Sequence, residues 1–220
     1  MGWIVSKELS CIFIHIPKTA GSSIGEPNYR KFRKGFLIKY LGNDDIAKAG
    51  HIKGIDLKEK YKDCWEDYFK FCFIRNPWDR FVSAYIYSKQ KISSIYSRVN
   101  STSSYKMRRS TFGSQLQQCH SFRDFCIKLE QFDLDIHFEP QVDYITDSKE
   151  NLLVDFIGKY ENLNQDFKKI CETIGLPGKV VLPHFRNTKH KIYREYYDNE
   201  TKKIVEKYYE KDIEMFKYQF

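Results

Sequence analysis

The sequence lacks any long apolar segment. No run in the 220-residue chain approaches the roughly 18 consecutive apolar residues that a membrane-spanning helix requires. The N-terminal stretch MGWIVSKELS also lacks the basic start and the long apolar run of a secretory signal. We therefore expect a soluble, cytoplasmic protein without stable membrane insertion.

The sequence contains cysteines, but none at a spacing typical of a redox or metal-binding site. The six cysteines include no C-x-x-C pair and no arrangement typical of a metal site. Cys11 and Cys72 stand in apolar stretches, where a buried thiol packs as a small hydrophobic group. The pattern predicts reduced, structural cysteines and no bound metal.

Acidic residues are too few to balance the basic ones, and the formal net charge is +8. Such a charge attracts polyanions in general, which include nucleic acids, acidic glycans and highly charged nucleotides. The hydrophobic fraction of 41% and the aromatic fraction of 16% are typical of a folded protein. We expect one domain over residues 1–220, in which the polar, Ser-rich and basic stretch 91–115 is a flexible insertion.

The stretch 11–25, CIFIHIPKTAGSSIG, predicts a strand that leads through a tight turn into a helix. Apolar residues form the strand, Pro17 ends it, and small residues from Lys18 to Ser23 form the turn. A turn that opens a helix directs several backbone N–H groups and the positive end of the helix dipole at one point. Together with the Lys18 charge, this arrangement predicts a phosphate or sulfate site.

A second strand-to-helix junction follows at residues 68–80. The aromatic stretch 68–74, YFKFCFI, predicts a buried strand that ends at Arg75. Asn76 is a favoured N-cap and Pro77 a favoured first helical residue, and the helix continues to about residue 90. Ligands of open α/β sheets bind at the carboxyl ends of the strands, so Arg75 and Ser83 are expected to bind a second anionic group.

The remaining periodicity completes an α/β pattern. A third strand is predicted at 152–157, and it closes at Tyr160. Helices are predicted near 55–61, after the cap Ser121, over 163–174 before Gly175, and from Asp198 onward as one long closing helix.

The first turn is not a Walker A loop. It lacks G-x-x-x-x-G-K-[ST], and Lys18 precedes the turn instead of following it. No Asp stands at a strand end where it could hold magnesium as a Walker B residue. These absences count against a nucleotide kinase or NTPase, which stays open as an alternative.

The two junction motifs resemble those of the sulfotransferases. The resemblance rests on residues 16–23, IPKTAGSS, and 73–85, FIRNPWDRFVSAY, with weaker similarity at Pro140-Gln141 and at 160–163. The closest branch is the carbohydrate type, which includes heparan sulfate 2-O-sulfotransferase and many bacterial relatives. The resemblance implies a P-loop-like α/β fold with a central, mostly parallel sheet flanked by helices. It also implies 3′-phosphoadenosine 5′-phosphosulfate as the donor.

The resemblance assigns roles to the residues of both motifs. Arg75 and Ser83 would bind the 3′-phosphate, and Lys18 would sit against the bridging oxygen, where negative charge grows as the S–O bond breaks. The 5′-phosphosulfate would be bound by the residues of the first turn, namely Lys18, Thr19, Ala20, Gly21, Ser22 and Ser23. Tyr160, Thr188 and Lys189 would line the adenosine side.

The acceptor hydroxyl needs a base, and two histidines are candidates. His51 is favoured because family members often carry a His-containing segment between the two motifs, and His137 is the rival because it precedes Pro140-Gln141. His15, beside the turn, is expected to be structural.

Together these features predict an enzyme that transfers a sulfuryl group to an acceptor hydroxyl, with a saccharide as the expected acceptor. The alternatives are the kinase or NTPase considered above and a non-catalytic binder of acidic polymers. We expect no metal and no nucleic-acid partner.

Overall fold

The computed structural model describes residues 4–25, 51–96, 111–176 and 191–220. These residues form two compact units, one of residues 1–75 and 140–187 and the other of residues 76–139 and 188–220. The chain crosses between the units three times, so neither unit is a continuous segment. The expectation of a single domain over residues 1–220 stays a prediction.

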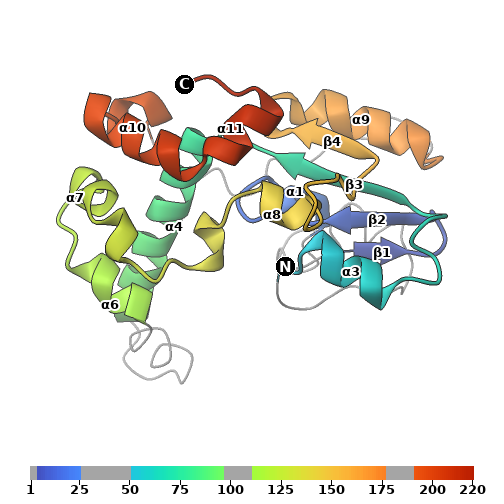
Figure 1. Ribbon diagram of the computed structural model, residues 1–220, viewed down its shortest axis with the longest axis horizontal. Coiled ribbons are helices and arrows are strands. Elements are labelled where there is room, and N and C mark those ends of the chain that lie inside the picture. Colours follow the sequence, from blue (N-terminus) through green and yellow to red (C-terminus); the bar gives the residue numbers. More distant parts are fainter. Residues whose placement is uncertain (1–3, 26–50, 97–110, 177–190) are drawn as a thin grey trace. The chain divides into compact units, whose positions relative to one another are not determined.

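The first unit contains a four-stranded sheet with strand order β1-β2-β3-β4 among its described residues (Figure 1). β1 is antiparallel to β2, whereas β2, β3 and β4 are mutually parallel. The strands are β1 (Ile4–Ser6), β2 (Cys11–Ile14), β3 (Phe69–Ile74) and β4 (Phe156–Lys159). This mostly parallel, helix-flanked sheet confirms the predicted fold class.

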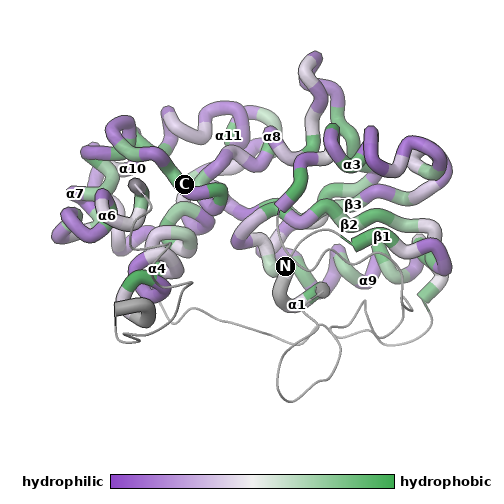
Figure 2. Tube along the Cα trace, turned by 90° about the horizontal axis from the view of Figure 1, so that it is seen from below, coloured by the Kyte–Doolittle hydropathy of each residue, from purple (hydrophilic) through white to green (hydrophobic). Residues whose placement is uncertain are grey.

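Helices cover both faces of the sheet. Successive side chains of a strand point to opposite faces, and here both faces carry apolar side chains that the helices bury. Phe13, Phe71 and Phe73 pack on one face against Phe167 and Ile170 of α9 (Leu163–Thr173). On the other face, a Cβ added to Gly54 in α3 (Gly54–Lys60) would lie 3.1 Å from Cδ1 of Ile14. Figure 2 shows α3 and α9 on opposite sides of the strands. The unit is completed by α1 (Gly21–Gly25), α8 (Val142–Ile145) and the 3-10 turn Tyr160–Asn162.

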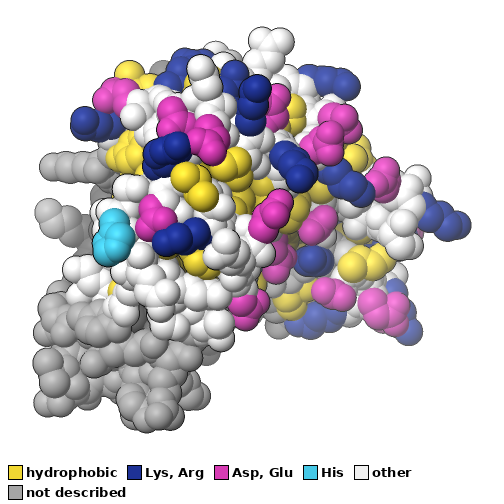
Figure 3. Space-filling model, turned by 60° about the vertical axis from the view of Figure 1, so that its left-hand side comes forward, with side chains coloured by type: hydrophobic (Ala, Val, Ile, Leu, Met, Phe, Trp, Pro, Cys, Tyr) yellow, Lys and Arg dark blue, Asp and Glu magenta, His cyan; other side chains and the backbone are white. Residues whose placement is uncertain are grey.

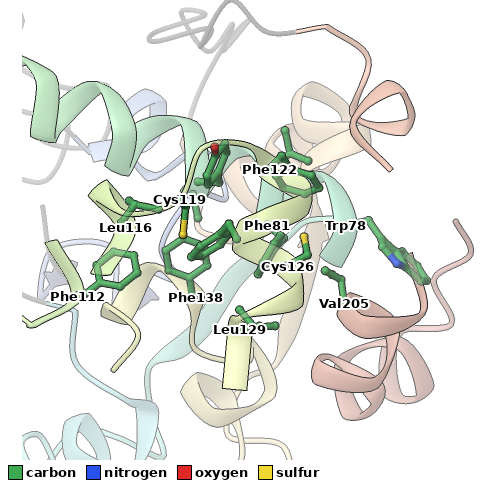
Figure 4. Close-up of a cluster of buried hydrophobic side chains, with 14 of the residues drawn as sticks. Trp78, Phe81, Phe112, Leu116, Cys119, Phe122, Cys126, Leu129, Phe138 and Val205 are labelled. Atoms are coloured by element: carbon green, nitrogen blue, oxygen red, sulfur yellow. The ribbon is translucent and has the colours of Figure 1, made fainter. Parts of the chain in front are cut away.

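The second unit consists of helices around an aromatic core in its described residues. Phe81 lies at its centre, next to Phe122 and Phe138 (Figure 4). The ring centroids of Phe122, Phe125, Phe138 and Tyr209 lie 5.4–6.1 Å from that of Phe81. The helices are α4 (Pro77–Tyr96), α6 (Thr111–Gln117), α7 (Phe122–Ile127), α10 (Asn199–Tyr208) and α11 (Glu210–Phe216). Short 3-10 turns span Leu129–Gln131, Ile136–Phe138 and Tyr193–Tyr196.

The local helix signals are confirmed. Asn76 Oδ1 accepts hydrogen bonds from the backbone N–H groups of Trp78 and Asp79, and Ser121 Oγ accepts one from Asp124. Gly175, with φ of 71°, follows the end of α9. These signals act within one helical turn, which is why the sequence reveals them.

Two expectations about elements are wrong. The third strand begins at Phe156, not at residue 152, because Leu153 N–H bonds the Ile145 carbonyl and Leu152 bridges Thr146 instead of joining the sheet. The closing helix is broken at the buried Tyr209, whose hydroxyl donates to the Phe138 carbonyl.

The stretch 91–115 is helical at both ends, and the expectation that it is a flexible insertion stays a prediction. α4 extends to Tyr96 and α6 starts at Thr111, while residues 97–110 lie outside the described part. In addition, β1 was not predicted, because three residues are too few to show a periodicity. Across the described ranges, no helix is both long and apolar enough to cross a membrane.

All six cysteines lie in described residues, and none forms a disulfide, as the sequence predicted. Five are buried, and burial raises the pKa of every one of these five thiols. The pKa of Cys11 rises to about 12 and that of Cys171 to about 11. Only Cys64 is partly exposed.

We predict that a thiol reagent labels one of the six cysteines quickly in the native protein at pH 8, and the other five only after unfolding in urea. The reacting species is the thiolate, which burial suppresses at the five sites. Stopped-flow absorbance with a disulfide reagent measures the fast amplitude, and Cys64→Ser should abolish it. A fast amplitude of two or more thiols would contradict the described packing.

Candidate anion site at the strand ends

The turn between β2 and α1 is held in an unusual backbone conformation. Lys18 and Ala20 have φ of 69° and 75°, in the left-handed region that costs a non-glycine residue about 1–2 kcal/mol. The buried Thr19 donates its hydroxyl to the Ile16 carbonyl at 2.9 Å, and the Ser23 N–H bonds the Ala20 carbonyl at 2.8 Å. Alternation into left-handed residues turns successive N–H groups inward, which suits an anion. The Thr19 hydroxyl therefore braces the turn.

His15 packs directly against this turn. Its side chain is buried, and a Cβ added to Gly21 would overlap the imidazole ring. Only glycine permits this close approach at the start of α1. The expectation that His15 is structural agrees with this position, although the sequence alone did not reveal its contact with Gly21.

His51 lies against His15, with their ring centroids 4.5 Å apart. His51 Nδ1 lies 3.1 Å from the His15 backbone carbonyl. A carbonyl oxygen can only accept, so Nδ1 donates its hydrogen, and in the neutral ring the lone pair then belongs to Nε2. The structure thus places His51 next to the turn through His15 and selects its tautomer.

Arg75 follows the last residue of β3 and reaches the same turn. Its guanidinium Nη1 donates to the Lys18 carbonyl at 3.3 Å, and its guanidinium carbon lies 4.3 Å from the centre of the Tyr160 ring. The backbone N–H and carbonyl of Arg75 both bond the side-chain amide of Gln141, each at 2.9 Å. This contact joins Arg75, at the end of β3, to the turn that follows β2, within the first unit.

Ser83 and His137 belong to the second unit. Ser83 is buried in α4, and its predicted partnership with Arg75 stays a prediction. His137 Nδ1 donates to the Asp135 carboxylate, its ring lies 4.9 Å from that of Tyr87, and its carbonyl accepts from Arg80. Burial would raise the pKa of Asp135, but the hydrogen bond and charge of His137 lower it below its ordinary value.

The remaining predicted site residues are placed as follows. Tyr160 lies under the Arg75 guanidinium, so its described contact is with that side chain. Ser22 belongs to α1, and Thr188 and Lys189 lie outside the described residues. In the described ranges, no group of three or more His, Cys, Asp and Glu side chains could hold a metal ion.

Two contacts of the site were missed by sequence reasoning. Gln141 was noticed only as part of a weak similarity, and its clamp on Arg75 joins residues 66 positions apart. The close approach of the His15 ring to Gly21 joins residues only six positions apart, but it depends on the path of the turn. The spacing of a single sequence encodes neither contact.

The fold and the site define an α/β protein with a candidate anion site at the carboxyl ends of its parallel strands. A model of the sulfotransferase family matches residues 1–219 of the chain. The chain belongs to the sulfotransferase family, which confirms the family expected from the two motifs.

Two relatives give the match more detail. An uncharacterised protein of Archaeoglobus fulgidus is 34% identical over 119 residues, which cover 54% of this chain and 78% of that protein. Carbohydrate sulfotransferase 14 of Mus musculus is 26% identical over 189 residues, or 82% of this chain and 48% of that protein. The matched region thus spans about half the length of the mouse relative. No solved structure matches the chain.

We predict that Gly21→Ala displaces His15 and, through it, His51, because the new Cβ would overlap the His15 ring. Long-range proton–nitrogen NMR of the imidazoles should show both histidines shifted. Gly175→Ala is a matched control, since an added Cβ there meets nothing within 4 Å and only its positive φ is strained. Unchanged His15 and His51 signals in folded Gly21→Ala would contradict the described packing.

Proposed function

We propose that this protein transfers a sulfuryl group from 3′-phosphoadenosine 5′-phosphosulfate to a hydroxyl of a saccharide. The observation that carries the proposal is the hydrogen bond from the Arg75 guanidinium to the Lys18 carbonyl. It gathers two cationic residues and a turn suited to anions at one edge of the sheet, as a donor with two anionic groups requires. Membership of the sulfotransferase family supports the reaction class.

In this proposal the first turn binds the 5′-phosphosulfate, and Lys18 stabilises the charge that develops on the bridging oxygen. Arg75 binds the 3′-phosphate through its planar fork of donors, with Ser83 as a further donor. Thr188 and Lys189 are proposed to line the adenosine side. Thr19 contributes through its backbone, because its hydroxyl braces the turn.

His51 is the proposed base. Its Nε2 takes the proton of the acceptor hydroxyl as the acceptor oxygen forms a bond to sulfur and the bond from sulfur to the bridging oxygen breaks. The products are a sulfate ester, 3′-phosphoadenosine 5′-phosphate and a proton on His51. The hydrogen bond from Nδ1 to the His15 carbonyl supports this role, because it holds the tautomer with the lone pair on Nε2.

A saccharide acceptor is supported by the similarity to a carbohydrate sulfotransferase of mouse. A cytoplasmic location is part of the same proposal and rests on the sequence expectation alone.

A mere binder of acidic polymers is less well supported. On the face drawn in Figure 3, Lys and Arg side chains are interspersed with Asp and Glu and do not gather in one patch. Among the described residues as a whole, Asp and Glu slightly outnumber Lys and Arg. The excess positive charge comes from residues 26–50, 97–110 and 177–190, the last two of which contain no acidic residue.

We predict that 3′-phosphoadenosine 5′-phosphate binds the wild-type protein and that Arg75→Lys weakens this binding about 10- to 100-fold, or about 1.4–2.8 kcal/mol. Lysine keeps the charge but loses the planar fork and the contact with Tyr160. Isothermal titration calorimetry measures the dissociation constants.

Arg123→Lys is the matched control, because Arg123 is half-exposed in the second unit and pairs with Asp198 and Glu200. The control should bind the nucleotide as the wild type does. Failure of the wild type to bind at saturating nucleotide would refute the proposed function.

We predict that His51→Gln lowers the turnover rate about 10²–10⁴-fold and leaves nucleotide affinity unchanged, since glutamine has an amide but cannot serve as the base. His137→Gln should keep the rate, since its ring is held by Asp135. Single-turnover kinetics with labelled donor separate the two. A loss of rate in His137→Gln with full activity in His51→Gln would show that the base is His137.

A further inference from the structure

Gln141 is fully buried, and its side-chain amide makes two hydrogen bonds to one residue. Oε1 accepts from the Arg75 N–H, and Nε2 donates to the Arg75 carbonyl, each at 2.9 Å. Although Gln141 stands at the N-cap position of α8, its side chain makes no capping hydrogen bond. The side chain is therefore directed to Arg75 and not to its own helix.

Arg75 is the first residue after β3, where the pairing between β3 and β4 has ended. The last register pair between β3 and β4 is Ile74 with Lys159. A buried backbone donor or acceptor without a partner is costly, and Arg75 is only 6% exposed. The Gln141 amide has the donor and acceptor of a peptide group, so it continues the ladder by one residue.

The far end of Arg75 is held as well, by the Tyr160 ring and the Lys18 carbonyl. A long side chain loses conformational entropy when it binds an anion. If its backbone and its guanidinium are already held in place, less entropy is lost on binding. The position of the guanidinium relative to the turn thus depends on the backbone that Gln141 clamps.

We infer that Gln141 is a positioning residue that holds Arg75 for a second phosphate and thereby makes the site selective for nucleotides with a 3′-phosphate. The inference rests on the proposed function. It extends that function by naming the residue that sets selectivity without touching the nucleotide.

The test compares two nucleotides, 3′-phosphoadenosine 5′-phosphate and adenosine 5′-monophosphate, which differ by the 3′-phosphate. Gln141→Leu removes both hydrogen bonds, and Gln141→Glu keeps the acceptor but loses the donor to the Arg75 carbonyl. Calorimetry should show affinity for the first nucleotide falling about tenfold or more in each variant, against less than about twofold for the second. A merely structural residue would lower both affinities alike.

Asp155→Asn is the matched control, because Asp155 bonds the backbone N–H of Lys70 near the opposite end of β3 and pairs with its ammonium group at 3.1 Å. The control should lose stability without a change in the ratio of the two affinities. Circular dichroism melting shows which variants fold. If Gln141→Leu does not fold, the ratio of the two affinities is measured in Gln141→Glu instead.

Two outcomes overturn the inference and are distinct. If the wild type binds the first nucleotide and Arg75→Lys weakens it, but the folded Gln141 variants keep the wild-type ratio of affinities, only the role of Gln141 is refuted. If the wild type binds neither nucleotide, the proposed function falls first and the inference falls with it.

Discussion

The hydrogen bond between the Arg75 guanidinium and the Lys18 carbonyl joins the ends of two parallel strands, and the geometry of the site depends on it. Parallel pairing of β2 with β3 brings their carboxyl ends to one edge of the sheet. There the turn adopts left-handed φ at Lys18 and Ala20, which these residues do not favour on their own. Packing of Thr19 and Gly21 offsets that cost. The Arg75 guanidinium and the turn thus meet before any ligand binds, and such preorganisation is what the proposed function uses.

In the proposed mechanism, two histidines beside the same turn add proton transfer to anion binding. Gly21 lets the His15 ring lie against the turn, and the His15 carbonyl fixes the tautomer of His51. A base gains from such orientation because the proton acceptor must lie within hydrogen-bond reach of the acceptor hydroxyl. His137 is oriented as well, but by Asp135 in the second unit. The favoured base is therefore His51, which lies beside the turn because it packs against His15.

Local chemistry explains what could be predicted from the sequence. The strand before Pro17, the cap at Asn76, the strand ending at Arg75 and the end of α9 at Gly175 each act within a few residues, and each is present. The shifted start of β4 was missed, because Leu152 and Leu153 are apolar like strand residues but pair with the end of α8. The hydrogen bonds of Gln141 to Arg75 were also missed, because the two residues are 66 positions apart in the chain. The partner of Gln141 is fixed by the fold, whereas spacing along the chain reports only neighbours.

The most direct measurement of the central claim is transfer of labelled sulfate from 3′-phosphoadenosine 5′-phosphosulfate to a panel of glycans, phenols and small alcohols. Mass spectrometry of the acceptors would report the added sulfate, with ATP and magnesium in a parallel reaction. The account predicts a sulfated saccharide from the sulfate donor and no turnover of ATP. Magnesium-dependent ATP turnover, with every acceptor unsulfated, would contradict it.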